Sequence, residues 1–133
     1  MFGVAVDEVT PQLRSRAKAV NFGIVYGQQA YGLSQTLDIP MAEAREMIDA
    51  YFRAYPGVRT YLDETVAFAK QSGYAETMYG RRRPIPELRV PAQRMFGERT
   101  AMNHPMQGSA ADIIKIAMVR VAERLRAEAL PPR

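Results

Sequence analysis

The sequence predicts a mainly α-helical fold with one small β-hairpin. Apolar residues recur at helical spacing in several stretches between residues 10 and 129, and proline or glycine stands near most of their ends. Residues 74–88 differ, because their side chains alternate with a period of two ahead of a glycine turn. Apolar residues make up 47% of the 133 residues, which is enough for the core of one domain or a large part of one.

The first helix is expected over residues 10–27. Thr10 is a favourable N-cap, Pro11 costs nothing in a first turn, and Gly27 is a typical helix stop. One side of this helix is apolar. A second, mixed stripe repeats every four residues and consists of Arg14, Lys18, Phe22 and Tyr26. A helix built only for packing would repeat apolar residues, so the mixed stripe indicates another role.

Three more helices are expected, over residues 30–37, 41–55 and 58–73. The tripeptide DIP breaks the chain before the second of them, and Pro56 with Gly57 separates the second from the third. Gly73 is expected to cap the third helix, because glycine readily adopts the left-handed conformation that ends many helices.

The hairpin at residues 74–88 is expected to carry Arg81, Arg82 and Arg83 at its tip. Residues 92–103 are expected to form a helix that Pro105 interrupts, since proline lacks the amide hydrogen needed in a helix interior. A long amphipathic helix is expected from about Ser109 to Ala129. The apolar residues expected to face largely inward in it are Ile113, Ile114, Ile116, Ala117, Val119, Val121 and Leu125.

Composition excludes several classes of site. The chain has no cysteine and one histidine, so disulfides and cysteine-ligated metals are excluded and a histidine-based metal site is not expected. No run of about 18 apolar residues predicts a membrane span, and the first ten residues do not resemble a signal peptide. We therefore expect a cytoplasmic protein with no membrane partner.

The positive charge is concentrated. The net charge is +4, and the segment from residue 81 to residue 99 holds six arginines against two acids, which accounts for all of it. Guanidinium groups bind phosphate through two parallel hydrogen bonds, so this cluster favours a nucleic-acid partner. A solvated basic loop is the alternative interpretation.

The mixed stripe has the length and chemistry for a nucleotide. Residues four apart on a helix are offset by about 40°, and twelve residues span roughly 18 Å. Arg14 and Lys18 would bind phosphates, Phe22 would form an apolar wall, and Tyr26 would stack on a base. The alternatives are that the aromatic rings belong to the core and that the cations are solvated.

A second group lies at residues 99–112. Asn103 and Gln107 are four apart and would share a face if the helix bridged Pro105. An amide side chain at the minor groove can check base-pair geometry without reading sequence. His104 is expected in a turn or at the surface, and Asp112 at a helix start, where a carboxylate favours the helix dipole.

At these residues the sequence resembles the family A DNA polymerases, the DNA polymerase I type of bacteria. RSRAKAVNFGIVYG is similar to the family's motif B, R-x3-K-x3-F-x3-Y-G. GYAETMYGRRRPIPEL is similar to its fingers hairpin, and NHPMQGSAADIIKIAM to the stretch before its last catalytic motif. The resemblance implies one partial domain over residues 1–133: fingers, with the motif B helix at about 10–27 and the hairpin at about 74–88, and part of the palm, with a palm-proximal helix at about 105–129.

The resemblance also implies residue roles. Arg14 and Lys18 match the cations that bind the dNTP triphosphate, Phe22 matches the residue on its sugar, and Tyr26, followed by Gly27, matches the residue at the template-base position. Positions near the DNA backbone are matched by Arg81, Arg82, Arg83 and Arg99. Positions at the primer–template minor groove are matched by Asn103 and Gln107.

The family's two metal-binding aspartate motifs are not found in this sequence. Polymerases use two metal ions, so the resemblance implies Mg²⁺ in the complete enzyme, with ligands outside this chain. We therefore expect a fragment of a DNA-directed DNA polymerase of replication or repair, acting at the nucleoid with dNTPs, primer–template DNA and the remainder of the polypeptide. Alone it is expected to be inactive. The alternatives are a non-catalytic nucleic-acid-binding module derived from polymerase fingers and a helical interaction protein whose stripe serves packing.

Overall fold

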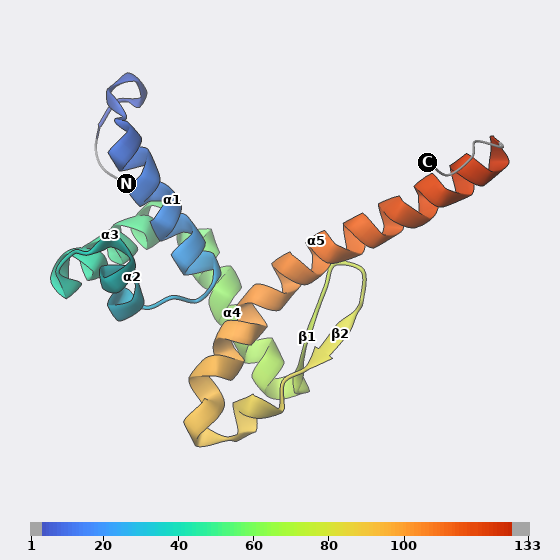
Figure 1. Cartoon of the computed structure of the whole chain (residues 1–133). Coiled ribbons are helices and arrows are strands. Elements are labelled where there is room, and N and C mark those ends of the chain that lie inside the picture. Colours follow the sequence, from blue (N-terminus) through green and yellow to red (C-terminus); the bar gives the residue numbers. More distant parts are fainter. Residues whose placement is uncertain (1–3, 129–133) are drawn as a thin grey trace.

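The structure, a computed structural model, describes residues 4–128 and is mainly helical (Figure 1). The α-helices are α1 (Pro11–Val25), α2 (Ala30–Leu37), α3 (Met41–Ala54), α4 (Pro56–Ser72) and α5 (Arg94–Ala127). The strands are β1 (Tyr74–Glu76) and β2 (Arg82–Pro84), and the short 3-10 helices are η1 (Val6–Glu8), η2 (Pro86–Arg89) and η3 (Pro91–Gln93). The helices α1, α2 and α3 form one arm, and the C-terminal half of α5 projects away from it as a second arm.

The ends of the helices follow local chemistry. The Leu13 amide donates to Thr10 Oγ1 at 3.2 Å, and Pro11 is the first residue of α1. After α1 the chain turns at Gly27, which has a φ of 68°, and α4 ends at Gly73, which has a φ of 82°. Glycine reaches this left-handed region without steric cost, so both stops predicted from the sequence are confirmed.

Two apolar clusters hold the fold together. The first lies among α1, α2, α3 and α4 and consists of Val20, Ile24, Leu33, Ala44, Tyr51 and Leu62. The second joins α4 and the hairpin to α5 and consists of Ala69, Ala75, Ile85, Leu88 and Ala101. Because α4 contributes to both clusters, it connects the arm that carries α1 to the part of α5 that carries the hairpin.

The hairpin is shorter than predicted, and two of its three arginines lie in a strand and not at the tip. β1 and β2 are antiparallel, with Tyr74 opposite Pro84 and Glu76 opposite Arg82. The turn closes where the Gly80 amide donates to the Thr77 carbonyl at 3.0 Å. Arg82 and Arg83 therefore belong to β2, so the prediction that three arginines occupy the tip was wrong.

Pro105 does not interrupt the helix. α5 runs without a break from Arg94 to Ala127, although a proline inside a helix costs about 3 kcal/mol. The helix tolerates it because the flanking turns are fixed by packing, with Ala101 fully buried on one side and Gly108 buried on the other. The predicted helix start, at about Ser109 or residue 105, was therefore wrong, and the predicted end at Ala129 lies outside the described residues.

The C-terminal half of α5 does not bury its apolar side chains. Ile114 is 61% exposed, and Val119 and Val121 are each 57% exposed. Ile113, Ala117 and Leu125 are also exposed, and Ile116 is half-buried. The expected inward orientation was wrong because α4, β1, η2 and η3, the elements that pack on α5, all meet its N-terminal part. None of the helices in residues 4–128 is long and apolar enough to cross a membrane.

Candidate nucleotide and DNA interface

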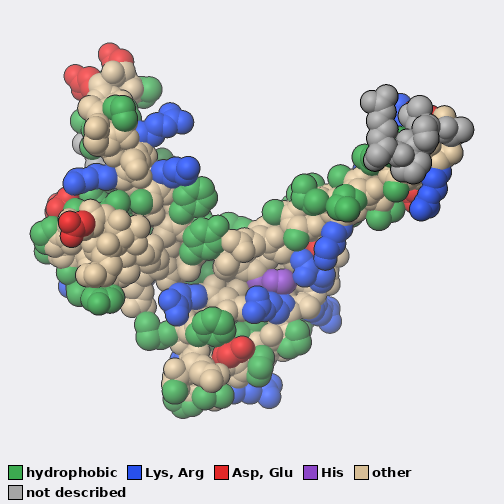
Figure 2. All heavy atoms as spheres, in the orientation of Figure 1, with side chains coloured by type: hydrophobic (Ala, Val, Ile, Leu, Met, Phe, Trp, Pro, Cys, Tyr) green, Lys and Arg blue, Asp and Glu red, His purple; other side chains and the backbone are tan. Residues whose placement is uncertain are grey.

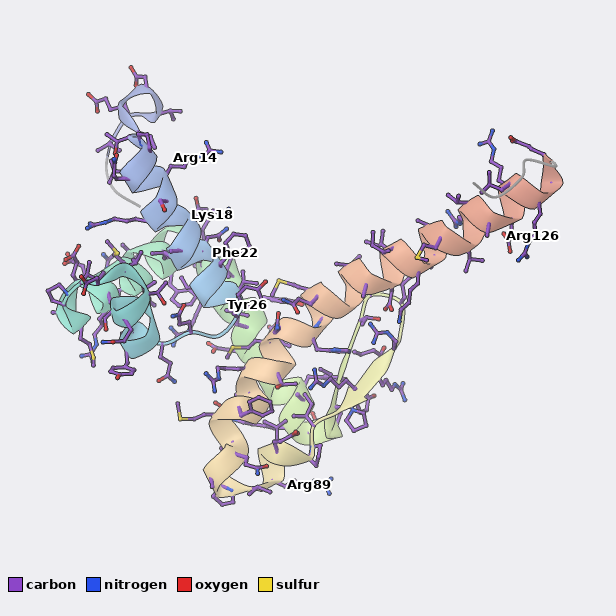
Figure 3. The ribbon with its side chains drawn as sticks, in the orientation of Figure 1. Arg14, Lys18, Phe22, Tyr26, Arg89 and Arg126 are labelled. Atoms are coloured by element: carbon purple, nitrogen blue, oxygen red, sulfur yellow. The ribbon has the colours of Figure 1, made fainter. Side chains whose placement is uncertain are left out.

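The mixed stripe of α1 faces away from the core. Arg14, Lys18, Phe22 and Tyr26 are all exposed, the two rings by 46% and 42%. The opposite side of the helix buries Val20, Gly23 and Ile24. Figure 3 shows the four stripe residues in a row along α1, on the side that faces the space between the two arms. Packing into the core does not explain this stripe.

Neighbouring side chains within the stripe contact one another. Lys18 Nζ lies 5.6 Å from the centre of the Phe22 ring. The Phe22 and Tyr26 rings are stacked, with centroids 6.2 Å apart and planes 16° from parallel. Within residues 4–128, Arg14 and Lys18 form no ion pair with a carboxylate. The stripe therefore combines two cations available to an anion with two aromatic surfaces in contact.

The end of α1 meets α5 at an open hollow of about 470 Å³. The lining residues come from the end of α1, from β2 and from α5, and they are Tyr26, Arg83, Phe96, Arg99, Thr100, Asn103, His104 and Gln107. In Figure 2 the single histidine lies next to Lys and Arg side chains in the depression between the arms. Asn103 and Gln107 share this hollow because α5 continues through Pro105.

His104 is buried, which contradicts the expectation of a turn or surface residue. It is 8% exposed, and its Nε2 has no hydrogen-bond partner; the neighbouring Asn103 Oδ1 is likewise buried without one. Burial lowers the pKa of His104, and the nearby charges of Arg81 and Arg83 lower it further. The Arg81 backbone and Asp112 act in the opposite direction. The imidazole is therefore neutral at neutral pH, and the charge of the hollow comes from its arginines.

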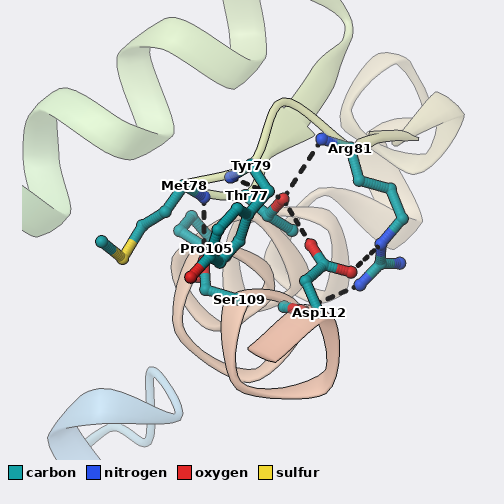
Figure 4. Close-up of polar contacts among 8 residues, drawn as sticks. Thr77, Met78, Tyr79, Arg81, Pro105, Ser109 and Asp112 are labelled. Atoms are coloured by element: carbon teal, nitrogen blue, oxygen red, sulfur yellow. Dashed lines mark hydrogen bonds and ion pairs between the residues drawn. The ribbon is translucent and has the colours of Figure 1, made fainter. Parts of the chain in front are cut away.

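Hydrogen bonds among Thr77, Arg81, Ser109 and Asp112 join the hairpin turn to α5, and this group is called the clamp below (Figure 4). Arg81 Nε donates to Asp112 Oδ1 at 2.7 Å, and an Arg81 terminal nitrogen donates to the Gly108 carbonyl at 3.0 Å. Thr77 Oγ1 donates to Asp112 Oδ2 at 2.7 Å, and this bond, followed by those from Arg81, lowers the pKa of Asp112. Asp112 lies in the middle of α5, so the expectation of a helix start was wrong.

Ser109 completes the clamp, and Arg82 is engaged elsewhere. The Met78 amide donates to Ser109 Oγ at 2.9 Å, while Ser109 Oγ donates to the Pro105 carbonyl. Arg82 pairs with Glu76 at 2.7 Å and lies 4.7 Å from the centre of the Tyr74 ring. Of the three consecutive arginines, Arg83 is the one that lines the hollow.

Gly27 lies where the turn after α1 contacts α5. A Cβ atom at this position would stand 2.9 Å from Arg99 Cγ and 3.0 Å from Met102 Sδ. A larger residue would therefore displace the Arg99 and Met102 side chains of α5. Gly27 lets Tyr26 and Arg99 approach closely enough to line one hollow.

Comparison with known proteins identifies the family. The sequence profile described as DNA polymerase family A matches residues 1–133. The chain belongs to this family. DNA polymerase I of Bacillus subtilis (strain 168) is 54% identical over 135 residues, and that of Bacillus caldotenax is 53% identical over 135 residues. Both alignments cover 100% of this chain and 15% of the relative.

A solved polymerase structure has the same fold. The POL domain of Pol1 from M. smegmatis, in complex with DNA primer-template and dNTP, matches with a TM-score of 0.90 at 47% identity. The match covers 97% of this chain and 23% of that chain. The resemblance to family A and the predicted fold class, helical fingers with a hairpin and part of the palm, are thus confirmed.

The described residues of this family A chain were compared with the requirements of a metal site. Residues 4–128 contain no group of three or more His, Cys, Asp or Glu side chains placed to hold a metal ion. The most buried carboxylate, Asp112, is already bonded to Thr77 and Arg81. The structure brings the end of the stripe of α1 and the polar residues of α5 to one open hollow.

Proposed function

We propose that this chain supplies the surface on which a family A polymerase binds an incoming dNTP and primer–template DNA. The observation that carries the proposal is the exposed stripe of α1, which ends in the hollow that holds Arg83, Arg99, Asn103 and Gln107. Its two rings are stacked, and its two cations form no ion pair among residues 4–128. The Pol1 structure that shares this fold is itself a complex with DNA primer-template and dNTP, which supports the proposal.

The stripe would bind the nucleotide along its length. Arg14 and Lys18 would bind the triphosphate, because unpaired cations on one face attract several phosphate oxygens at once. Phe22 would pack on the sugar. Tyr26, followed by Gly27, would occupy the template-base position, since an exposed ring at the end of the helix can stack on a base.

The hollow at α5 would bind the primer–template duplex. Arg83 and Arg99 would contact the DNA backbone, while Asn103 and Gln107 would contact the minor groove, where the acceptors of all base pairs are similarly placed. Arg81 and Arg82 would act on DNA indirectly, because Arg81 is bonded to Asp112 in the clamp and Arg82 is paired with Glu76 outside it. For these two arginines the proposal differs from the roles that the sequence motif implies.

The chemistry of nucleotide addition would need the rest of the polymerase. The chain spans about 15% of the length of the DNA polymerase I relatives it matches. We propose that residues 1–133 form one partial domain of fingers and adjoining palm, and that carboxylates elsewhere in the enzyme hold Mg²⁺ for template-directed DNA synthesis in replication or repair. The isolated chain would then show no templated incorporation in a primer-extension assay, and incorporation by the pure chain would overturn this part of the proposal.

Binding by the chain tests the proposal directly. Fluorescence anisotropy would follow a labelled primer–template duplex with and without the dNTP that pairs with the next template base. Lys18→Ala is expected to reduce dNTP-dependent binding by about 10-fold, because a charge-assisted contact to phosphate is lost. Asn103→Ala is expected to weaken duplex binding about 3- to 10-fold whether or not dNTP is present.

A matched control separates specific contacts from loss of charge. Arg53 is exposed on α3 and lines neither the hollow at α5 nor the stripe, so Arg53→Ala removes one positive charge elsewhere. Its effect on binding is expected to be under twofold at 150 mM salt, where exposed charges are screened. Equal losses in Arg53→Ala and Lys18→Ala would contradict a nucleotide site on α1.

A further inference from the structure

A second hollow, of about 550 Å³, opens beside the first half of α1. Its lining comes from α1 and from the end of α3, and consists of Arg14, Ala17, Lys18, Asn21, Tyr51 and Tyr55. Tyr55 lies between two helices, as the C-cap of α3 and the residue before Pro56 of α4. Its backbone is therefore held by both helices. The sequence patterns did not identify Asn21, Tyr51 or Tyr55 as site residues.

Two lining residues of this hollow, Asn21 and Tyr55, keep a hydrogen-bond donor that is not used within residues 4–128. Tyr51 Oη donates to Asn21 Oδ1 at 2.9 Å, so the amide oxygen of Asn21 is occupied and its NH₂ group remains a donor. The Tyr55 ring packs against Tyr51 with centroids 5.0 Å apart and is 54% exposed. Within residues 4–128 the Tyr55 hydroxyl has no hydrogen-bond partner in the protein.

The charges of the lining have one sign. Arg14 and Lys18 are cationic, and no carboxylate belongs to the lining. Two cations, an amide NH₂ group and a phenol around one hollow match a ligand that offers several anionic oxygens close together. Phosphate groups have that chemistry, whereas a neutral or cationic ligand would leave the two cations without compensation.

We propose that Asn21 and Tyr55 extend the phosphate site of Arg14 and Lys18, so that this hollow binds the terminal phosphates of a nucleoside triphosphate. This inference rests on the proposed function and adds two donors from outside the stripe. A DNA backbone phosphate has the same chemistry. A free triphosphate offers more charge to a compact donor set than one diester does, which favours the nucleotide as occupant.

The test uses Tyr55→Phe, which removes the hydroxyl and keeps the ring that packs on Tyr51. Inorganic tripolyphosphate, dTTP and a primer–template duplex would each be titrated into the chain by calorimetry. Tyr31→Phe is the matched control, because Tyr31 is 65% exposed on α2 and does not line this hollow. Tyr55→Phe is expected to weaken tripolyphosphate and dTTP about 3- to 10-fold, with the Tyr31→Phe variant unchanged.

The outcomes distinguish a nucleotide triphosphate from a DNA backbone phosphate. They also distinguish failure of this inference from failure of the proposed function. A loss confined to the duplex would assign the site to backbone phosphate and overturn the triphosphate assignment. Unchanged affinities in Tyr55→Phe alongside weaker dTTP binding in Lys18→Ala would overturn this inference alone. No change in either variant would overturn the proposed function as well.

A chimera covers the case in which the chain alone binds polyphosphate too weakly to measure. Residues 1–133 would replace the matching segment of Bacillus subtilis DNA polymerase I, to which they are 54% identical. Tyr55→Phe is then expected to raise the KM for dTTP about 3- to 10-fold with little change in kcat. An unchanged KM would overturn the inference.

Discussion

Replacing Gly27 with alanine is expected to lower the free energy of unfolding by about 2–4 kcal/mol, since two costs add. The φ of 68° at this residue disfavours any side chain by about 1–2 kcal/mol. The new Cβ would also stand 2.9 Å from Arg99 Cγ and 3.0 Å from Met102 Sδ, so these two side chains of α5 would have to shift. Urea unfolding followed by circular dichroism measures the change.

Gly80 provides the matched control for Gly27. Its φ of 79° is similarly left-handed, but a Cβ there would meet nothing within 4 Å. Gly80→Ala is therefore expected to cost only the backbone term, about 1–2 kcal/mol. If the two variants lost equal stability, the close approach of α1 and α5 at Gly27 would contribute nothing.

Replacing Gly108 with alanine is expected to weaken both the fold and its binding of DNA. The added Cβ would stand 2.6 Å from Thr77 Cγ2 and 3.1 Å from His104 Cε1. Overpacking of this kind costs about 1–3 kcal/mol, and the better helix propensity of alanine returns about 1 kcal/mol of it. Because the turn would move away from α5, Arg83 would shift in the hollow, and primer–template affinity is expected to fall several-fold.

Gly57 is the reference for Gly108. It lies in the first turn of α4, and a Cβ there would meet nothing within 4 Å. Gly57→Ala is expected to leave DNA affinity unchanged and to stabilise the chain slightly, by about 0.5–1 kcal/mol. Unchanged DNA affinity in Gly108→Ala, measured by anisotropy below its unfolding transition, would show that the clamp does not position Arg83.

Rules about capping residues and side-chain periodicity predicted the helices and the hairpin wherever neighbouring residues determine their ends. Thr10 and Pro11 start α1, Gly27 and Gly73 end helices, and the period-two segment forms the hairpin. These features depend on residues within a turn of each other. The same rules failed at Pro105, because packing of residues distant in sequence against α5 outweighs the local cost of proline.

The part of the candidate site that lies on the single helix α1 was predictable from the sequence, whereas the parts that depend on contacts between helices were not. The four-residue spacing identified the stripe of α1 but left open whether its rings belong to the core, and the motif resemblance supplied the expected roles of its residues. The structure shows that the four residues are exposed. The ion pair between Arg81 and Asp112 was not predictable, because the two residues are 31 positions apart and no local pattern links them. The hollow with Tyr55 also depends on how α3 packs on α1, which spacing within either helix does not give.

The unbroken course of α5 has a mechanical consequence. The 34 residues of α5 follow a path of about 51 Å, which bends in its N-terminal part (Figure 1). The N-terminal part holds the hairpin, and the C-terminal half carries exposed apolar side chains. Because the C-terminal half projects freely, a tilt of about 5° where α5 leaves the hairpin would move the far end of the helix by several ångströms. A contact made on the exposed C-terminal half would therefore be transmitted to Arg99, Asn103 and Gln107. Pro105, which has no amide hydrogen to donate, lies between that half and Arg99 and is the natural point for α5 to flex.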